Sequence, residues 1–151
     1  MHRLPALSLV VIVVLAAVAA GCGEEGAANG ATVSVYVPAS LCGEAQAALR
    51  KKGWSAGDLK IRLACFPPVE KRGGIDLAAA GAKARRATED STSVAYLETP
   101  GPAARFSQTI VESANLAWLE TSSASTAMRR IVKALEGGSS SPRKAVLDEV
   151  G

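Results

Sequence analysis

The sequence contains a single histidine, His2. Histidine is the usual general base near neutral pH and a common metal ligand. Because we expect His2 to be removed with an export signal, the remaining chain has no imidazole. This excludes serine–histidine–aspartate and cysteine–histidine catalysis. Metal-ligand clusters and a glycine-rich phosphate loop are also lacking. We therefore predict a protein that is not an enzyme and that has no cofactor and no metal site.

Aromatic residues are scarce, at 4% of the chain, and charge is nearly balanced, with a formal net charge of +3. The basic residues form isolated pairs, such as Lys51-Lys52 and Arg85-Arg86, and no basic stripe interleaved with aromatic residues is present. Such pairs are typical of solvated faces and of the C-terminal ends of helices. The composition predicts no nucleic acid partner.

The N-terminus has the pattern of an export signal. His2 and Arg3 give a positive start, residues 4–20 form an apolar run, and the small residues Ala19-Ala20-Gly21 stand directly before Cys22. A charged start, an apolar segment and small residues at the cleavage point define such a signal. We expect residues 1–21 to be a signal peptide that forms a helix.

The residues before and including Cys22 resemble the bacterial lipobox, with Ala19 where leucine is usual. The resemblance implies cleavage before Cys22 and a diacylglyceryl group on its thiol. That lipid would hold the chain on the outer side of the cell membrane, in an extracytoplasmic or periplasmic location. Two alternatives stay open, an uncleaved transmembrane anchor and a plain secretory signal. The apolar run of about 17 residues is at the lower limit for crossing a bilayer, and both alternatives also place the rest of the chain outside the cytoplasm.

Beyond the signal, residues 22–31 are expected to be a flexible tether, and residues 32–151 one domain of ordinary size. The domain contains two cysteines, Cys42 and Cys65. In an oxidising compartment an even pair favours a disulfide over two free thiols. Such a bridge would close a loop of about 22 residues and contribute about 3 kcal/mol.

Segments that favour strands alternate with segments that favour helices along this domain. Residues 71–74 are expected to be a loop. The expected strands are residues 32–37, 59–66, 93–97 and 116–120, and the expected helices are residues 44–52, 77–86, 105–113, 128–135 and 142–150. This order predicts an α/β fold, a three-layer Rossmann-like single lobe with a mainly parallel four-stranded sheet.

In an open sheet of this kind, ligands bind beyond the carboxyl ends of the strands. Residues 38–42, 98–102 and 121–126 fall at these ends. Cys42 and Cys65 both lie near such ends, so neighbouring first and second strands would bring them within bridging distance. Glu98 and Glu120 also lie at strand ends, where they would either hold a cation or be solvated.

Four consecutive segments carry a resemblance to a known family. Residues 81–90 (GAKARRATED), 93–98 (SVAYLE), 106–115 (FSQTIVESAN) and 116–123 (LAWLETSS) resemble the first lobe of type 1 periplasmic binding proteins, the leucine/isoleucine/valine-binding group that serves ABC transporters. The resemblance covers about residues 32–126, and residues 128–151 look like the closing helices of the same family. The chain has no room for a second lobe, so we hypothesise a family derivative that has lost it.

The resemblance implies a site for a small amino-acid-like ligand. In the family, hydroxyl and backbone N–H groups after the third and fourth strands grip the ligand, and those positions map to Thr99, Thr121, Ser122 and Ser123. The segment Pro100-Gly101-Pro102 departs from the family pattern, because proline supplies no N–H group. The alternative interpretation is that these residues form ordinary polar turns.

Two functional hypotheses follow. In the first, the chain is a lipoprotein that resembles the substrate-binding component of a branched-chain amino acid ABC transporter. It would be truncated to one lobe, would bind its ligand weakly and could interact with an ABC permease. In the second, it is a structural or protein-interaction lipoprotein that docks or self-associates through the open face of the lobe. Trp54, Trp118 and Phe66 would then be either contact anchors or core residues.

Overall fold

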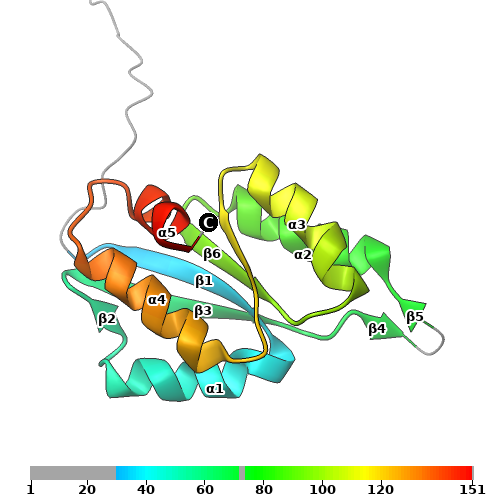
Figure 1. Cartoon of the computed structure of the whole chain (residues 1–151), viewed down its shortest axis with the longest axis horizontal. Helices are drawn as coiled ribbons and strands as arrows, with labels where there is room; N and C mark the ends of the chain where they lie inside the picture. Colours follow the sequence, from blue (N-terminus) through cyan, green and yellow to red (C-terminus); the bar gives the residue numbers. More distant parts are fainter. Residues whose placement is uncertain (1–29, 72–73, 151) are drawn as a thin grey trace, which may run out of the picture.

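The computed structural model describes residues 30–71 and 74–150 (Figure 1). The expected signal peptide, Cys22 and the tether up to residue 29 lie outside the described residues. The elements, in chain order, are β1 (Thr32–Pro38), α1 (Ala39–Lys51), β2 (Ser55–Ala56), β3 (Leu59–Phe66), β4 (Glu70–Lys71), β5 (Gly74–Ile75), α2 (Leu77–Glu89), β6 (Ser93–Glu98), α3 (Pro102–Ser113), β7 (Ala117–Glu120), α4 (Ala124–Glu136) and α5 (Pro142–Val150). Among these residues no helix combines the length and hydrophobicity needed to cross a membrane.

The main sheet has five strands in the order β2-β3-β1-β6-β7. The four strands expected from the sequence are present and parallel, but β2 pairs with β3 in the antiparallel direction. The sheet is therefore mixed and five-stranded, and the expectation of four strands was wrong. The added strand arises because Gly57, with a φ of 57°, allows a tight turn that folds β2 back onto β3.

Strand β1 is central. It pairs with β3 from Thr32↔Lys60 to Pro38↔Phe66 on one side, and with β6 on the other. The chain thus moves from β1 to β3, then crosses back over β1 to β6, and continues outward to β7. The direction of winding reverses between β1 and β6, so the chain leaves their carboxyl ends toward opposite faces of the sheet, to α1 and to α3.

Helices cover both faces of this sheet (Figure 1). Side chains alternate along a strand, so Val33, Val35 and Val37 of β1 face one helix layer and Tyr36 faces the other. The first layer, α1, α4 and α5, encloses the larger core, which includes Leu49, Leu97, Met128, Ile131 and Val146. The second layer, α2 and α3, encloses a smaller core that includes Phe66, Tyr96, Val111 and Leu116.

Three helices begin earlier than the sequence predicts, among them α3, which begins at Pro102 and not at residue 105. Helix α1 begins at Ala39, directly after Pro38, because Leu41 and Cys42 continue the buried face formed by Ala45 and Leu49. Helix α4 begins at Ala124, where the Ser123 side chain accepts a hydrogen bond from the Thr126 N–H. Serine at that position satisfies an N–H group that the helix itself cannot pair.

Residues 71–74 were expected to form a loop. The structure instead places Glu70–Lys71 and Gly74–Ile75 in a short antiparallel pair, β4 and β5. This pair extends beyond the main sheet next to the start of α2 (Figure 1). Asp76 then begins α2 as predicted, because its side chain accepts a hydrogen bond from the Ala79 N–H at 3.0 Å.

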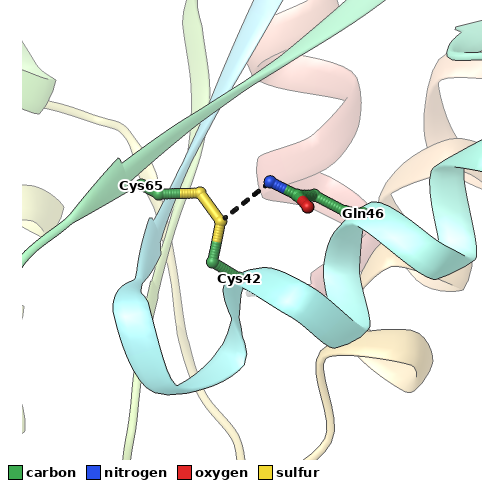
Figure 2. Close-up of a disulfide and its surroundings, with 3 residues drawn as sticks. All are labelled: Cys42, Gln46 and Cys65. Carbon is green, nitrogen blue, oxygen red and sulfur yellow. Dashed lines mark hydrogen bonds between the residues drawn. A yellow bond between two sulfur atoms is a disulfide. The ribbon is translucent and has the colours of Figure 1, made fainter.

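The predicted disulfide between Cys42 and Cys65 is confirmed (Figure 2). Cys42 lies in the first turns of α1 and Cys65 near the end of β3, with their Cα atoms 5.9 Å apart. That separation is in the usual range for a bridge. The parallel pairing of β1 with β3 brings them together, because α1 follows directly from β1. Gln46 Nε2 lies 3.6 Å from Cys42 Sγ (Figure 2).

Candidate functional site

The carboxyl ends of β1, β3, β6 and β7 meet at one edge of the sheet, which we call the carboxyl edge. Thr99 follows β6 and Thr121 follows β7 there, and the Thr121 N–H donates to the Glu98 carbonyl at 2.9 Å. The structure therefore brings together the strand ends on which the predicted ligand residues lie. This is the edge where open α/β sheets bind their ligands.

A small pocket lies at the carboxyl ends of β1, β3 and β6. Its volume is about 60 Å³, and it is lined by Pro38, Ala39, Ser40, Phe66, Pro67, Pro68, Val69, Glu98 and Thr99. Pockets for drug-sized ligands occupy several hundred Å³. This pocket is therefore too small to enclose an amino acid as it stands.

Glu98 supplies a buried carboxylate at this pocket, with 5% of its surface exposed. It accepts hydrogen bonds from the Tyr96 hydroxyl at 3.3 Å and from the Thr99 N–H at 3.2 Å. Burial, followed by the negative charge of Glu98, raises the pKa of Tyr96 well above its usual range. The phenol therefore stays protonated and continues to donate to the carboxylate.

The floor beneath Glu98 is aromatic. The rings of Phe66 and Tyr96 stack with centroids 5.2 Å apart, and the Lys83 ammonium lies 5.4 Å from the Phe66 centroid. Lys83 also donates to the carbonyls of Pro67 and Pro68. Phe66 is thus held in the core, so it is not an exposed contact anchor.

The amino end of α4 presents backbone N–H donors at the carboxyl edge, and a side chain from α1 already occupies it. Glu44 accepts from the Ser125 N–H at 2.9 Å, the Ala124 N–H at 3.1 Å and the Ser123 hydroxyl at 3.0 Å. A helix amino end binds carboxylates because its first N–H groups are unpaired and its dipole is positive there. Glu44 satisfies that requirement from within the chain.

These contacts change the acidity of Glu44. The Ser125 N–H hydrogen bond contributes most, and with the bonds from the Ser123 hydroxyl and the Ala124 N–H it lowers the pKa of Glu44 from 4.5 to about 2. Glu44 is therefore ionised at any physiological pH. No local pattern indicates this role of Glu44, because Glu44 and Ser125 are 81 positions apart.

The predicted ligand residues after β7 are mostly engaged in the turn itself. The Thr121 hydroxyl donates to the Ser123 carbonyl at 3.0 Å, and the same oxygen accepts from the Ser123 N–H at 3.0 Å. The Ser123 hydroxyl contacts both Glu44 and Thr126. Ser122 is exposed. This arrangement has the hydrogen bonding of a polar turn that caps a helix.

Glu120 is exposed beside Glu98, since the two occupy matching positions on β7 and β6. An open depression of about 380 Å³ is lined by Gly101, Pro102, Arg105 and Glu120. Within residues 30–71 and 74–150, no group of three or more histidine, cysteine, aspartate or glutamate side chains is placed to hold a metal ion.

The two tryptophans lie in different surroundings. Trp118 on β7 is half-buried, and its Nε1–H donates to the Ser107 hydroxyl at 3.3 Å. Trp54, which precedes β2, has 37% of its surface exposed. Of the three aromatic residues considered as contact anchors, only Trp54 is exposed. It lies at the end of the domain opposite the carboxyl edge, because α1 runs back along the sheet before reaching it.

Compared with protein-family models, curated proteins and solved structures, the chain shows no match. The chemistry of its own residues therefore carries the functional proposal.

Proposed function

We propose that the chain is a membrane-anchored extracytoplasmic lipoprotein whose single Rossmann-like lobe binds small amino-acid-like ligands weakly or not at all. In this proposal residues 1–21 are removed and lipid on Cys22 holds the domain at the outer side of the membrane. Support for this proposal comes from the mainly parallel sheet with helices on both faces, since the resemblance to type 1 periplasmic binding proteins implies a lobe of that class.

The single observation that carries the weak binding is the carboxylate of Glu44 at the amino end of α4. Ser123, Ala124 and Ser125 supply the donors that would grip a ligand carboxylate, and all three already serve Glu44. An incoming carboxylate would have to displace a side chain tethered to α1. A second lobe normally closes over the ligand and excludes water, whereas residues 30–71 and 74–150 form a single lobe.

The disulfide supports the extracytoplasmic location. Bridges such as Cys42–Cys65 form and persist in oxidising compartments and are rare in the cytosol. The bridge joins α1 to β3, and so it holds the helix that carries Glu44 against the sheet. Oxidation in that compartment would thus stabilise the same contact that closes the donor site.

Calorimetry tests the ligand-binding part of the proposal. Leucine, isoleucine and valine titrated into the chain purified from membranes are expected to give no submicromolar binding. Glu44→Ala frees the α4 donors, and its weak response to the same ligands in large excess would identify the blocked site. Submicromolar binding by the unchanged protein would contradict the proposal.

Cell fractionation tests the anchor. The chain is expected in the membrane fraction, and Cys22→Ala is expected to lose lipid and to appear in a soluble fraction or to remain unprocessed. Cys65→Ser is the matched control, because it also removes one thiol but leaves Cys22 in place. Equal membrane retention of the Cys22→Ala variant with an uncut signal would instead favour a transmembrane anchor.

A protein-interaction lipoprotein is the second candidate. It is favoured by the same observation, because a lobe whose donor site is filled from within still presents Arg105 and Glu120 around an open depression at the carboxyl edge. Docking or self-association there would use surface charge rather than an enclosed ligand. Light scattering on the purified chain distinguishes the two, since a stable dimer lost on Arg105→Glu would support the interaction role.

A further inference from the structure

The chain enters the domain beside the end of α1. The Gly30 N–H donates to the Asp58 carbonyl at 2.9 Å, and the Ala31 carbonyl accepts from the Lys60 N–H at 2.9 Å. Asp58 lies in the turn between β2 and β3, and the Trp54 carbonyl accepts from the Ile61 N–H across the same pair of strands. The entry point, Trp54 and Lys60 are thus neighbours at the edge opposite the carboxyl edge.

This end of the molecule carries several exposed basic residues and an exposed ring, and the exposed Asp58 lies beside them. We define the basic tip as Arg50, Lys51, Lys52, Trp54 and Lys60, all of them exposed. Lys52 is 3.6 Å from Glu136. Within the described ranges, Arg50, Lys51 and Lys60 form no ion pair, so their charges are available to a partner.

The position of the basic tip near a membrane depends on the anchor, so its role there rests on the proposed lipid at Cys22. Eight residue steps separate Cys22 from Gly30, and a fully extended chain of that length reaches about 29 Å at most. A lipid on Cys22 therefore keeps the entry point, and the basic tip beside it, within that distance of the headgroups.

We propose that the basic tip docks onto the anionic headgroups of the membrane that holds the anchor. Each lysine or arginine near an anionic surface strengthens association about fivefold, and tryptophan favours the headgroup region because its ring is apolar while its N–H is polar. The docked orientation points the carboxyl edge away from the membrane, where it is open to ligands or to another protein.

The end of α2 provides a matched comparison within the same chain. Arg85 and Arg86 are also an exposed basic pair near the end of a helix. They belong to α2, which lies in the other helix layer (Figure 1), and Trp54 is not part of that layer. A general attraction of cations to lipid would treat both pairs alike, whereas docking through the tip depends on Arg50 and Lys51 and not on Arg85 and Arg86.

The fluorescence of Trp54 in the lipid-modified full chain tests the proposal. A Trp118→Phe background leaves Trp54 as the only tryptophan. The protein is reconstituted into vesicles of phosphatidylcholine alone or with phosphatidylglycerol, each containing brominated lipid as a quencher. We expect quenching in the phosphatidylglycerol vesicles, which high salt reverses. Arg50→Gln with Lys51→Gln is expected to lower the ratio of docked to undocked protein about 25-fold, and Arg85→Gln with Arg86→Gln to leave it unchanged.

The possible failures are distinguishable. If the protein does not float with either kind of vesicle, the lipid anchor is wrong. If it floats but Trp54 is unquenched in both, or if the two double variants behave alike, the docking proposal is overturned while the anchor stands. The acidic residues Glu24 and Glu25 of the tether are the alternative to lipid headgroups as the partner of the tip. Quenching seen only after Glu24→Gln with Glu25→Gln would show that the tether covers the tip, and it would also overturn the proposal.

Discussion

Glu44 on α1 accepts a hydrogen bond from the backbone N–H of Ser125, in the first turn of α4, at 2.9 Å. This contact joins two helices of the same layer and fills the amino end of α4 with a carboxylate from the chain itself. A helix that begins at a ligand-binding edge normally leaves those N–H groups for an anion. Here the same chemistry joins α1 to α4, which links the stability of the domain to the occupied amino end of α4.

Glu44→Ala is expected to lower the urea midpoint of unfolding, because three donors at the start of α4 lose their acceptor. Glu44→Gln should have a smaller effect, since its amide oxygen still accepts but carries no charge to interact with the helix dipole. Equilibrium unfolding followed by circular dichroism measures both. Glu89→Gln is the control, because Glu89 is exposed at the end of α2. Equal midpoints for the Glu44 and Glu89 variants would contradict the contact.

The same contact predicts that the stability of the folded state depends on pH. The hydrogen bonds lower the pKa of Glu44 to about 2 from an ordinary value of 4.5, so the folded state releases this proton more readily than the unfolded state. The stabilisation is therefore complete above pH 4.5 and is lost as the pH falls toward 2. Urea midpoints of the native chain and of Glu44→Gln should converge across that interval, and a constant difference down to pH 2 would refute the assignment.

The disulfide is expected to contribute about 3 kcal/mol to the free energy of unfolding, because Cys42 and Cys65 are 23 positions apart and their bridge restricts the unfolded chain. Denaturant unfolding of the Cys42→Ser, Cys65→Ser double variant measures this loss. A reducing agent should destabilise the native chain by a similar amount and leave the double variant unaffected. Equal sensitivity of both proteins to the reducing agent would contradict the bridge.

Both tyrosines are expected to resist ionisation. Burial raises the pKa of Tyr96, and the Glu98 charge adds to that shift, while burial and the hydrogen bond to Asp90 raise the pKa of Tyr36. The folded state therefore keeps both protons above pH 10, where an unfolded chain begins to lose them. Stability that is complete below pH 10 should fall as the pH rises further. Tyrosinate absorbance should appear together with unfolding. Its appearance in a folded protein near pH 10 would contradict the raised pKa values of the two tyrosines.

The variant Tyr96→Phe tests the hydrogen bond between the Tyr96 hydroxyl and the buried Glu98 carboxylate. Removing the hydroxyl takes away the hydrogen bond that it donates to the Glu98 carboxylate at 3.3 Å, and a hydrogen bond to a charged group contributes about 1.5–3 kcal/mol. Tyr36→Phe is the matched control, since it removes a hydroxyl that donates to Asp90 at 3.1 Å in a less buried setting. A larger loss for the Tyr36 variant, measured by urea unfolding, would argue against the importance of the Glu98 contact.

The local parts of this fold could be predicted from the sequence. Strands β1, β3, β6 and β7 were predicted to within one or two residues, because alternation of apolar and polar side chains is a property of the strand itself. The parallel order also predicted which strand ends meet, and with them the pairing of Cys42 with Cys65. Asp76 was predicted to cap α2 because aspartate before an apolar helical pattern is a local signal.

The missed features depend on contacts between distant segments. Helix α4 begins among Ser123, Ala124 and Ser125, residues that by themselves favour a turn, and Glu44 from α1 stabilises that first turn. Strand β2 has two residues and exists only through its pairing with β3. Glu44 was missed as a site residue for the same reason, since no spacing along the chain connects it to α4.

The mass of the chain purified from bacterial membranes without reducing agent tests the central proposal most directly. The account predicts a chain that begins at Cys22, carries a diacylglyceryl group on that residue, and is two hydrogens lighter because Cys42 and Cys65 are joined. A chain that keeps residues 1–21, or that carries no lipid and two free thiols, would contradict it.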